Sequence, residues 1–430
     1  MLTLSSVPAL IRVGLVFIAI LIVIRKNGSL GVSFITGALL LSLFFGLGPL
    51  STLTSACGAI LHPKTWTLAI IISLILILST SMEISGRMQK MLLRFQGLVA
   101  SPRLNLIIFP ALIGLLPMPG GTLFSAPMVK EISGKYHISP DRLSFINFWF
   151  RHIWEYWWPL YPGVLLLTAL ANIHTAAFIA WMLPMTVFAL VFGCFTLNHA
   201  GIHSADNTLL NQPKKYYPFI IELTPILIVV FFGVGAGSLI DIWLPGLPVG
   251  KETGLILSLM CAILWVWRDT SMSAGQIKRI LANRQLVKMM FLIVSIFIFK
   301  GILEDSQAVG AVAKELLVFN IPIFLIALML PLLVGIITGI TVAVVGTAFP
   351  IIIPLIHSTG QSHLMIPYMM ISLTCGFIGV LLSPLHLCFI LSNEFFHADM
   401  KKMYQHLFFP CLGMVGAGVC YFYLLTYWFV

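Results

Sequence analysis

Three ionisable residues stand close together in a segment that is otherwise apolar and aromatic. Arg151, His152 and Glu155 lie between Asn147 and Pro159, in the string Asn-Phe-Trp-Phe-Arg-His-Ile-Trp-Glu-Tyr-Trp-Trp-Pro. Charged side chains in apolar membrane segments are costly and usually face the protein interior or a wet cavity. Because Arg151 and Glu155 are four residues apart, a helix would place them on one face. The segment therefore indicates either a site for an anion and a proton, or a structural ion pair in an aromatic belt.

Two apolar stretches, about 104–130 and about 321–353, are interrupted midway, by Pro117-Met-Pro-Gly-Gly-Thr122 and by Thr338-Gly-Ile-Thr341. Proline breaks helical hydrogen bonding, glycine permits close ligand approach, and a half-helix starting there offers free N–H groups and a positive dipole end. We predict two re-entrant hairpins; one kinked span in each stretch is the alternative. The tips then indicate a binding site or simple packing of Gly and Pro, which are common in membrane helices. The candidate substrate-binding residues are Pro119, Gly120, Gly121, Thr122, Ser125, Asn147, Arg151, Thr338, Gly339 and Thr341.

A second broken segment reads Ser383-Pro384-Leu-His386 and lies late in another long apolar run. Proline is expected to break the helix there. His386 could relay a proton, because histidine changes its charge near neutral pH, or it could simply bond a neighbouring carbonyl. The candidate coupling residues are therefore His152, Glu155 and His386.

These residues need elements that cross lipid. The chain has 430 residues, of which 59% are hydrophobic and 9% charged, and its mean hydropathy is +1.04. Soluble proteins carry roughly 25% charged residues, so lipid must be the main solvent. Apolar runs of spanning length predict ten crossings, at about 7–24, 30–47, 65–82, 143–170, 174–198, 219–240, 253–267, 287–303, 364–393 and 406–429. The fold class is thus an all-α polytopic membrane protein.

Positive charge orients the chain. With ten crossings and two re-entrant hairpins, 18 Lys and Arg residues fall on one side and 4 on the other, while Arg12 and Arg151 lie within spans; this accounts for all 24. The positive-inside rule places the side with 18 positive residues in the cytoplasm. The protein would then lie in the cell inner membrane with both termini on the outer side. The net charge of +10 is explained in the same way and does not indicate nucleic-acid binding.

Short strings recur along the chain. Pro110-x-Leu-Ile-Gly114 recurs as Pro331-x-Leu-Val-Gly335 and Glu83-x-Ser85 as Glu304-x-Ser306, each shifted by 221, and Pro159-Leu-Tyr161 resembles Pro384-Leu-His386, shifted by 225. We predict an internal duplication: 1–198 as the first repeat, 199–216 as a cytoplasmic linker and 217–430 as the second repeat. Five crossings per half is an odd number, so the second repeat is inverted, which is typical of transporters with a midplane site.

The string Leu115-Leu-Pro-Met-Pro-Gly-Gly-Thr-Leu-Phe-Ser-Ala-Pro127, together with Asn147–Glu155, resembles a family of integral membrane proteins, the domain of unknown function numbered 401. That family is similar to a branch of the ion-transporter superfamily, beside gluconate permeases and divalent-anion/sodium symporters. The resemblance implies a scaffold and a transport domain, elevator-like movement and a homodimer. Those symporters carry Ser-Asn-Thr at their hairpin tips, and the tips of this chain lack that Asn.

The residues and the resemblance together predict a secondary active transporter of a small organic anion, coupled to H⁺ or Na⁺. The alternative is a Na⁺/H⁺ antiporter in which Glu155 titrates. A membrane enzyme is disfavoured because no HExxH string, Cys/His nucleophile pair or clustered acidic motif occurs. No cofactor is expected beyond Na⁺ as a coupling ion. The spacing of the seven cysteines predicts neither a disulfide framework nor a metal site.

Overall fold

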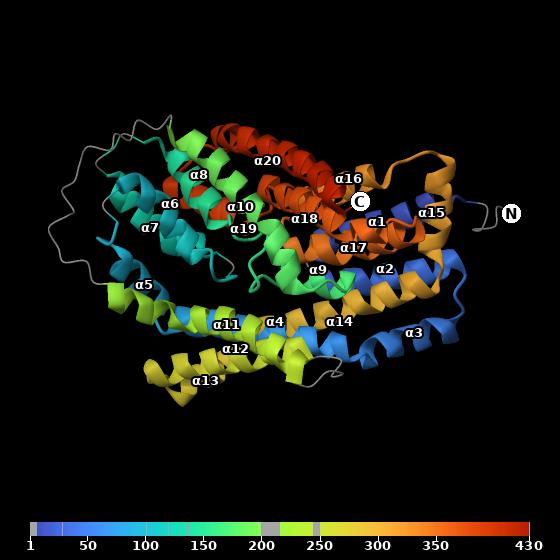
Figure 1. Cartoon of the computed structure of the whole chain (residues 1–430), viewed down its shortest axis with the longest axis horizontal. Coiled ribbons are helices and arrows are strands. Elements are labelled where there is room, and N and C mark those ends of the chain that lie inside the picture. Colours follow the sequence, from blue (N-terminus) through green and yellow to red (C-terminus); the bar gives the residue numbers. More distant parts are fainter. Residues whose placement is uncertain are drawn as a thin grey trace.

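The computed structural model describes residues 7–27, 29–99, 101–118, 120–134, 136, 138–198, 216–243 and 250–429. Within these residues all regular structure is helical and no strand occurs (Figure 1). Seven helical segments of this part are long and apolar enough to cross a membrane, judged by length and composition alone. The predicted linker 199–216 lies outside the described residues except for Tyr216, and Pro119 lies outside them as well.

The helices of the first half are α1 (Ala9–Asn27), α2 (Leu30–Phe45), α3 (Pro49–Leu61), α4 (Pro63–Ile84), α5 (Arg87–Phe95), α6 (Pro102–Ile113), α7 (Thr122–Ser133), α8 (Pro140–Arg151), α9 (Pro162–Ala171) and α10 (Thr175–Asn198). Those of the second half are α11 (Tyr216–Trp243), α12 (Gly250–Asp269), α13 (Ala274–Leu281), α14 (Arg284–Asp305), α15 (Ala308–Val318), α16 (Ile323–Thr338), α17 (Thr341–Ser358), α18 (Met365–Leu382), α19 (Leu387–Phe396) and α20 (Met400–Phe429). A short 3-10 helix, η2 (Ser362–Leu364), leads into α18.

The helices of the second half follow one another in the order of the first. α5 begins at Arg87 and α15 at Ala308, a shift of 221, and α9 begins at Pro162 and α19 at Leu387, a shift of 225. The three recurring strings have these same offsets, two of them 221 and one 225. Helices of the two halves thus begin at the same intervals as the recurring strings.

Backbone conformation repeats with the helices. Gly120 and Gly339, at the two hairpin tips, both have positive φ, of 74° and 65°. Asn172 at the end of α9 has φ 54°, and His397 at the end of α19 has φ 52°. Non-glycine residues seldom adopt this left-handed conformation, so its occurrence at the same place in both halves is specific evidence for a common plan.

The helices form two layers that each draw on both halves. α1–α5 pack mainly with α11–α15, and we call this group the scaffold layer; α6–α10 pack mainly with α16–α20, and we call this group the site layer. In Figure 1, α4, α11, α12 and α14 run below α8, α18 and α20. The more extensive contacts between the layers join α17 with α14 and α15, α1 with α16, α4 with α9, and α5 with α6 and α7.

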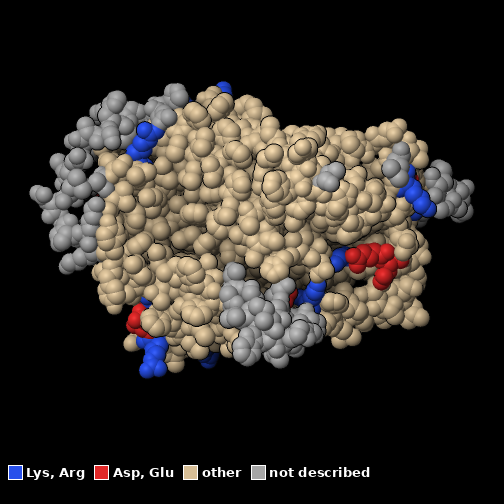
Figure 2. Space-filling model, viewed as in Figure 1, with Lys and Arg blue, Asp and Glu red and all other residues tan. Residues whose placement is uncertain are grey.

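The face of the molecule shown in Figure 2 carries few charged side chains, and most of these gather toward the two ends of the long axis. This distribution is expected where lipid is the solvent, because charge is tolerated near the polar interfaces and is costly between them.

The two interrupted stretches form helical hairpins. α6 and α7 pack on each other and have 12 residues each, which gives about 18 Å of helix, less than the roughly 30 Å of a hydrocarbon core. α16 and α17 pair in the same way. A Cβ on Gly114 would lie 2.0 Å from the carbonyl oxygen of Arg151, and one on Gly335 would lie 2.2 Å from that of Gly376. Because Gly335 and Gly376 are the counterparts of Gly114 and Arg151, both hairpins dock on a neighbouring helix by the same close contact.

The scaffold layer is held by a buried ion cluster. Arg87 Nε lies 3.0 Å from Glu222 Oε2, and Arg87 Nη1 lies 2.6 Å from Asp269 Oδ2. Arg94 Nη1 approaches the other Glu222 oxygen at 2.9 Å, and Arg87 also donates to the carbonyl oxygen of Ile221 at 2.5 Å. The cluster ties α5 to α11 and α12, and all the groups in it are paired.

Two short helices were not predicted from the sequence. α3 has no buried residue, and in α13 only Ile280 is buried. α3 therefore lacks a buried face, and α13 places Ile277, Ile280 and Leu281 at helical spacing but has only eight residues, too few for a span-length pattern. In α13 the Ser273 hydroxyl accepts from the N–H of Gln276, and the Gln276 side chain accepts from the N–H of Ser273, which is a capping box.

Candidate functional site

The first broken helix is held open by its aromatic residues. α8 ends at Arg151 and α9 begins at Pro162, and the residues between them form turns that we call the first break. Trp154, Trp158 and Tyr161 donate to backbone carbonyls near the end of α6, at 2.8, 2.9 and 2.7 Å. These three aromatic side chains therefore fix the first break to the first hairpin rather than forming a belt at the membrane surface.

Arg151 lies at the tip of the first hairpin, buried and incompletely paired. Its Nη2 donates to the carbonyl oxygen of Met118 at 2.7 Å, and its Nη1 lies 4.0 Å from Glu155 Oε1, at the outer limit of an ion pair. Its Nε has no partner, and neither has the buried hydroxyl of Thr122. A Cβ on Gly121 would lie 2.5 Å from Nη2, so only glycine lets the guanidinium lie against the tip. A buried hydrogen-bond donor without a partner costs free energy. An anion that accepts from Arg151 Nε would remove that cost, so this position favours anion binding.

Asn147 ties the first hairpin to α8 and α19. Its Oδ1 accepts from Ser125 Oγ at 2.6 Å, and its Nδ2 donates to the carbonyl oxygen of Thr122 at 3.1 Å and to Ser392 Oγ at 3.2 Å. Its polar atoms are therefore occupied by the protein. Asn147 and Ser125, both predicted to bind substrate, hold the tip in position, and of this group the Thr122 hydroxyl stays unpaired.

The second hairpin brings its tip to the same place. Thr341 Oγ1 lies 3.5 Å from Glu155 Oε2, and its methyl group would contact a Cβ on Gly163 at 2.9 Å. Gly339 offers its carbonyl oxygen to the second break, residues 383–386. The Thr338 hydroxyl, in contrast, donates to the carbonyl oxygen of Val334 in its own helix at 2.8 Å. Thr341 and Gly339 thus border the site, whereas Thr338 stabilises α16.

The two predicted coupling histidines meet at the centre. His152 Nε2 and His386 Nε2 are 3.1 Å apart, although 234 residues separate them in the chain. His152 Nδ1 faces the carbonyl oxygen of Phe148 at 2.5 Å, and His386 Nδ1 faces that of Gly339 at 2.8 Å. The sulfur of Cys388 joins them, and the three ligand atoms lie within 4.8 Å of one another. The structure thus forms a His–His–Cys cluster from both halves, which spacing did not predict.

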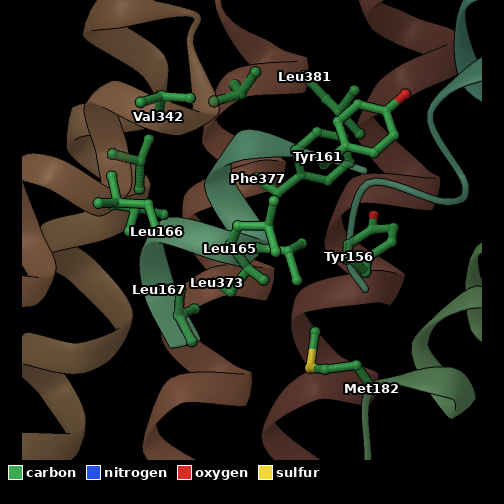
Figure 3. Close-up of a cluster of buried hydrophobic side chains, with 14 of the residues drawn as sticks. Tyr156, Tyr161, Leu165, Leu166, Leu167, Met182, Val342, Leu373, Phe377 and Leu381 are labelled. Carbon is green, nitrogen blue, oxygen red and sulfur yellow. The ribbon is translucent and has the colours of Figure 1, made fainter. Parts of the chain in front are cut away.

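An apolar wall closes the site on one side. Figure 3 shows Tyr156, Tyr161 and Phe377 at one end of a buried cluster that Leu166 of α9 extends toward Val342 of α17. The rings of Tyr156 and Phe377 meet edge to face with centroids 4.9 Å apart. Such packing keeps water away and strengthens the electrostatic interactions beside it.

A cavity of about 600 Å³ lies between the scaffold helices α3, α4 and α14 and the far end of α9. Lys64, Asn172 and Lys300 line it, and Lys64 Nζ donates to Asn172 Oδ1 at 2.7 Å across the two layers. A second cavity of about 540 Å³ shares Asn172 and Lys300 and extends to α17. Since α9 has ten residues, the first break lies about 15 Å from these cavities along the helix.

Several site residues escaped the sequence analysis. Ser144, Ser392 and Asn393 extend the Asn147 network: Ser144 Oγ donates to Asn393 Oδ1 at 2.6 Å and lies 3.2 Å from Ser392 Oγ. Cys388 is the other omission, although the string His386-Leu-Cys388 carries a weak ligand signal. The partner of that string, His152, lies in the other half, so no local spacing could have revealed the cluster.

Comparison with known proteins places the whole chain in one family. No curated protein matches the sequence. A family model described as "Protein of unknown function (DUF401)" matches residues 3–425, nearly the whole chain. The chain therefore belongs to the DUF401 family.

Proposed function

We propose that the chain is a secondary active transporter of a small organic anion, coupled to H⁺ or Na⁺, with its site at the hairpin tips and the two breaks. The observation that carries this proposal is Arg151, a buried guanidinium with an unpaired Nε beside the unpaired hydroxyl of Thr122. A carboxylate placed there would accept from both groups.

The architecture supports transport rather than a fixed receptor. Each half contributes a hairpin and a broken helix to the site, which matches inverted-repeat transporters with discontinuous helices. The site layer meets the scaffold layer through limited contacts, so one layer could move past the other as in an elevator. We further propose ten crossings, both termini outside, an inner-membrane location and a homodimer, on the sequence arguments given above.

The Na⁺/H⁺ antiporter alternative has weaker support. Its titrating carboxylate would be Glu155, which already lies 4.0 Å from Arg151 Nη1 and 3.7 Å from His152 Nε2. A carboxylate that faces a guanidinium has less affinity for Na⁺ than one facing oxygen ligands. Proteoliposomes that acidify or alkalinise in response to a sodium gradient alone, without any organic anion, would favour the antiporter.

The test is uptake of labelled organic anions by proteoliposomes containing the wild type or Arg151→Ala. Wild type is expected to accumulate at least one anion of a mono- and dicarboxylate panel under an imposed pH or sodium gradient, and Arg151→Ala is expected to lose that uptake while inserting normally. Arg94→Ala, which removes a half-exposed arginine of the scaffold layer, is the matched control and should retain uptake. Undiminished uptake by Arg151→Ala would remove Arg151 from the site.

A further inference from the structure

The two histidines face each other with the same ring nitrogen, and this fixes their proton count. Both Nδ1 atoms point at carbonyl oxygens, those of Phe148 and Gly339, which can only accept, so both Nδ1 atoms carry hydrogen. Two neutral rings would then present lone pairs to each other across the 3.1 Å between His152 Nε2 and His386 Nε2. A third proton between these atoms turns the contact into a hydrogen bond, and the pair then carries one positive charge.

Arg151 decides which ring holds the third proton. Its Nη1 lies 3.3 Å from His152 Nε2, and a guanidinium can only donate, so His152 Nε2 accepts. His386 is therefore the imidazolium. It is also the more exposed ring, half-buried where His152 is 2% exposed, which gives the proton an approach from the side of the second break.

The other groups around the pair set the charge balance. Arg151 from α8 is positive and Glu155 from the first break is negative, so they cancel. Cys388, from the start of α19, is the remaining group within reach that can change its charge. As a thiolate it balances the charge of the imidazolium.

The remaining elements that pack on the pair bring no charge. α17 contributes Thr341, whose hydroxyl faces Glu155. α18 contributes Phe377, whose ring centroid lies 6.2 Å from that of His152. The hydroxyl of Tyr161 donates to a carbonyl of α6. The described groups around the pair therefore sum to zero charge, counting the thiolate.

We propose that His152, His386 and Cys388 form the proton-binding site of the transporter, which takes up one proton with each substrate, and that the substrate is a small monoanion such as a monocarboxylate. This inference rests on the proposed function. When the anion binds beside Arg151 it adds one negative charge, and a proton transferred to the Cys388 thiolate, giving the thiol, restores neutrality. Uncompensated charge in a buried site is costly, so the two events are linked.

A dianion does not fit the same balance. It would need a second proton, and with Cys388 already a thiol the nearest place for it is His152 Nε2. Two imidazolium rings would then face each other with nitrogens 3.1 Å apart, which like-charge repulsion makes strongly unfavourable. Dicarboxylates should therefore be rejected unless one carboxyl group is protonated.

The test uses wild-type proteoliposomes with lactate, pyruvate and other small monocarboxylates, and with succinate as the dianion. An inward pH gradient should accumulate a monocarboxylate by about tenfold per pH unit, as expected for one proton per anion. A sodium gradient or an imposed potassium-diffusion potential should have no effect, because the cycle is electroneutral. Two results would overturn the inference while leaving the proposed transport function intact. One is uptake driven by sodium and independent of the pH gradient, and the other is succinate uptake equal to that of the monocarboxylate at pH 7.5.

Two variants with matched controls locate the proton. His386→Gln and Cys388→Ala should each lose uphill accumulation under the pH gradient, whereas His363→Gln, at an exposed position in η2, and Cys411→Ala, buried in α20, should behave as wild type. Retained proton coupling in His386→Gln would overturn the assignment. Elemental analysis tests whether the cluster holds a metal ion instead of a proton. One equivalent of zinc or copper in the purified wild type, lost in Cys388→Ala, would overturn the proton assignment. If no anion is taken up under any gradient, the proposed function fails and the inference with it.

Discussion

Two buried arginines in this molecule have opposite surroundings. In the scaffold layer, Arg87 meets two carboxylates at 3.0 and 2.6 Å and a backbone carbonyl as well. In the site layer, Arg151 is equally buried, yet its carboxylate partner stands 4.0 Å away and its Nε has no partner. Burial is therefore the same for the two arginines, and what differs is the completeness of their pairing, on which the proposed binding role of Arg151 depends.

The two halves of the site layer make a second contrast. The position equivalent to Arg151 in the second half is Gly376, and that equivalent to Glu155 is Val380, at the same shift of 225. The duplicated fold supplies two hairpins and two breaks, while the Arg151–Glu155 pair belongs to the first half alone. The duplication therefore gives the two halves matching hairpins and breaks, whereas the arginine stands in one half only, which suits the proposed substrate with a single charged end.

The largest expected effect is on the scaffold arginine. Arg87→Met would leave the buried Glu222 with only half-exposed Arg94 as its partner, and breaking such a buried pair costs about 3–5 kcal/mol. We expect a loss of detergent-solubilised folded protein and a lowered melting temperature, measured by fluorescence-detected size exclusion after heating. A melting temperature equal to that of the wild type would show that the Arg87 cluster does not stabilise the fold. The contrast between Arg87 and Arg151 would then not hold.

Arg151→Lys should affect transport more than folding. Lysine keeps the charge but loses the planar donors that reach both the Met118 carbonyl and an anion, so we expect uptake to fall at least about tenfold. The melting temperature should fall far less than in Arg87→Met. The comparison is refuted if Arg151→Lys melts as low as Arg87→Met, since Arg151 would then be as structural as Arg87.

Two glycines separate packing from binding at the first hairpin. Gly114→Ala would place Cβ 2.0 Å from a backbone oxygen and should impair folding, whereas Gly121→Ala would meet the Arg151 guanidinium, a side chain that can shift. Gly121→Ala should therefore fold, with a raised KM for uptake because the guanidinium moves off the tip. An unchanged KM would show that the contact between Gly121 and Arg151 does not shape the site.

The smallest expected effect is at the rim of the scaffold cluster. Arg94 is 40% exposed, and its pairing with Glu222 is the kind of surface ion pair that contributes roughly 0–1 kcal/mol. Arg94→Gln should shift the melting temperature slightly and should leave uptake unchanged. A shift approaching that of Arg87→Met would mean that Glu222 depends on both arginines equally.

Much of this site was visible in the sequence because lipid makes polar residues conspicuous. Arg151, His152, Glu155 and the Gly-Pro interruptions stand out from apolar surroundings, and the structure brings Arg151, Gly121 and Thr341 to one place. The split between binding and supporting roles was not visible. Asn147 and Thr338 looked like ligands, yet their hydrogen bonds are satisfied within the protein, which only the geometry could reveal.

The sequence by itself indicated lipid as the solvent, and it predicted the helical class and the places where helices break, because these depend on local composition and short spacing. Only the tertiary structure decided that α1–α5 and α11–α15 form one layer, that His152 meets His386 and Cys388, and that Arg151 keeps an unpaired nitrogen. Contacts between residues more than 200 positions apart depend on how the two halves pack, and no local pattern encodes that packing.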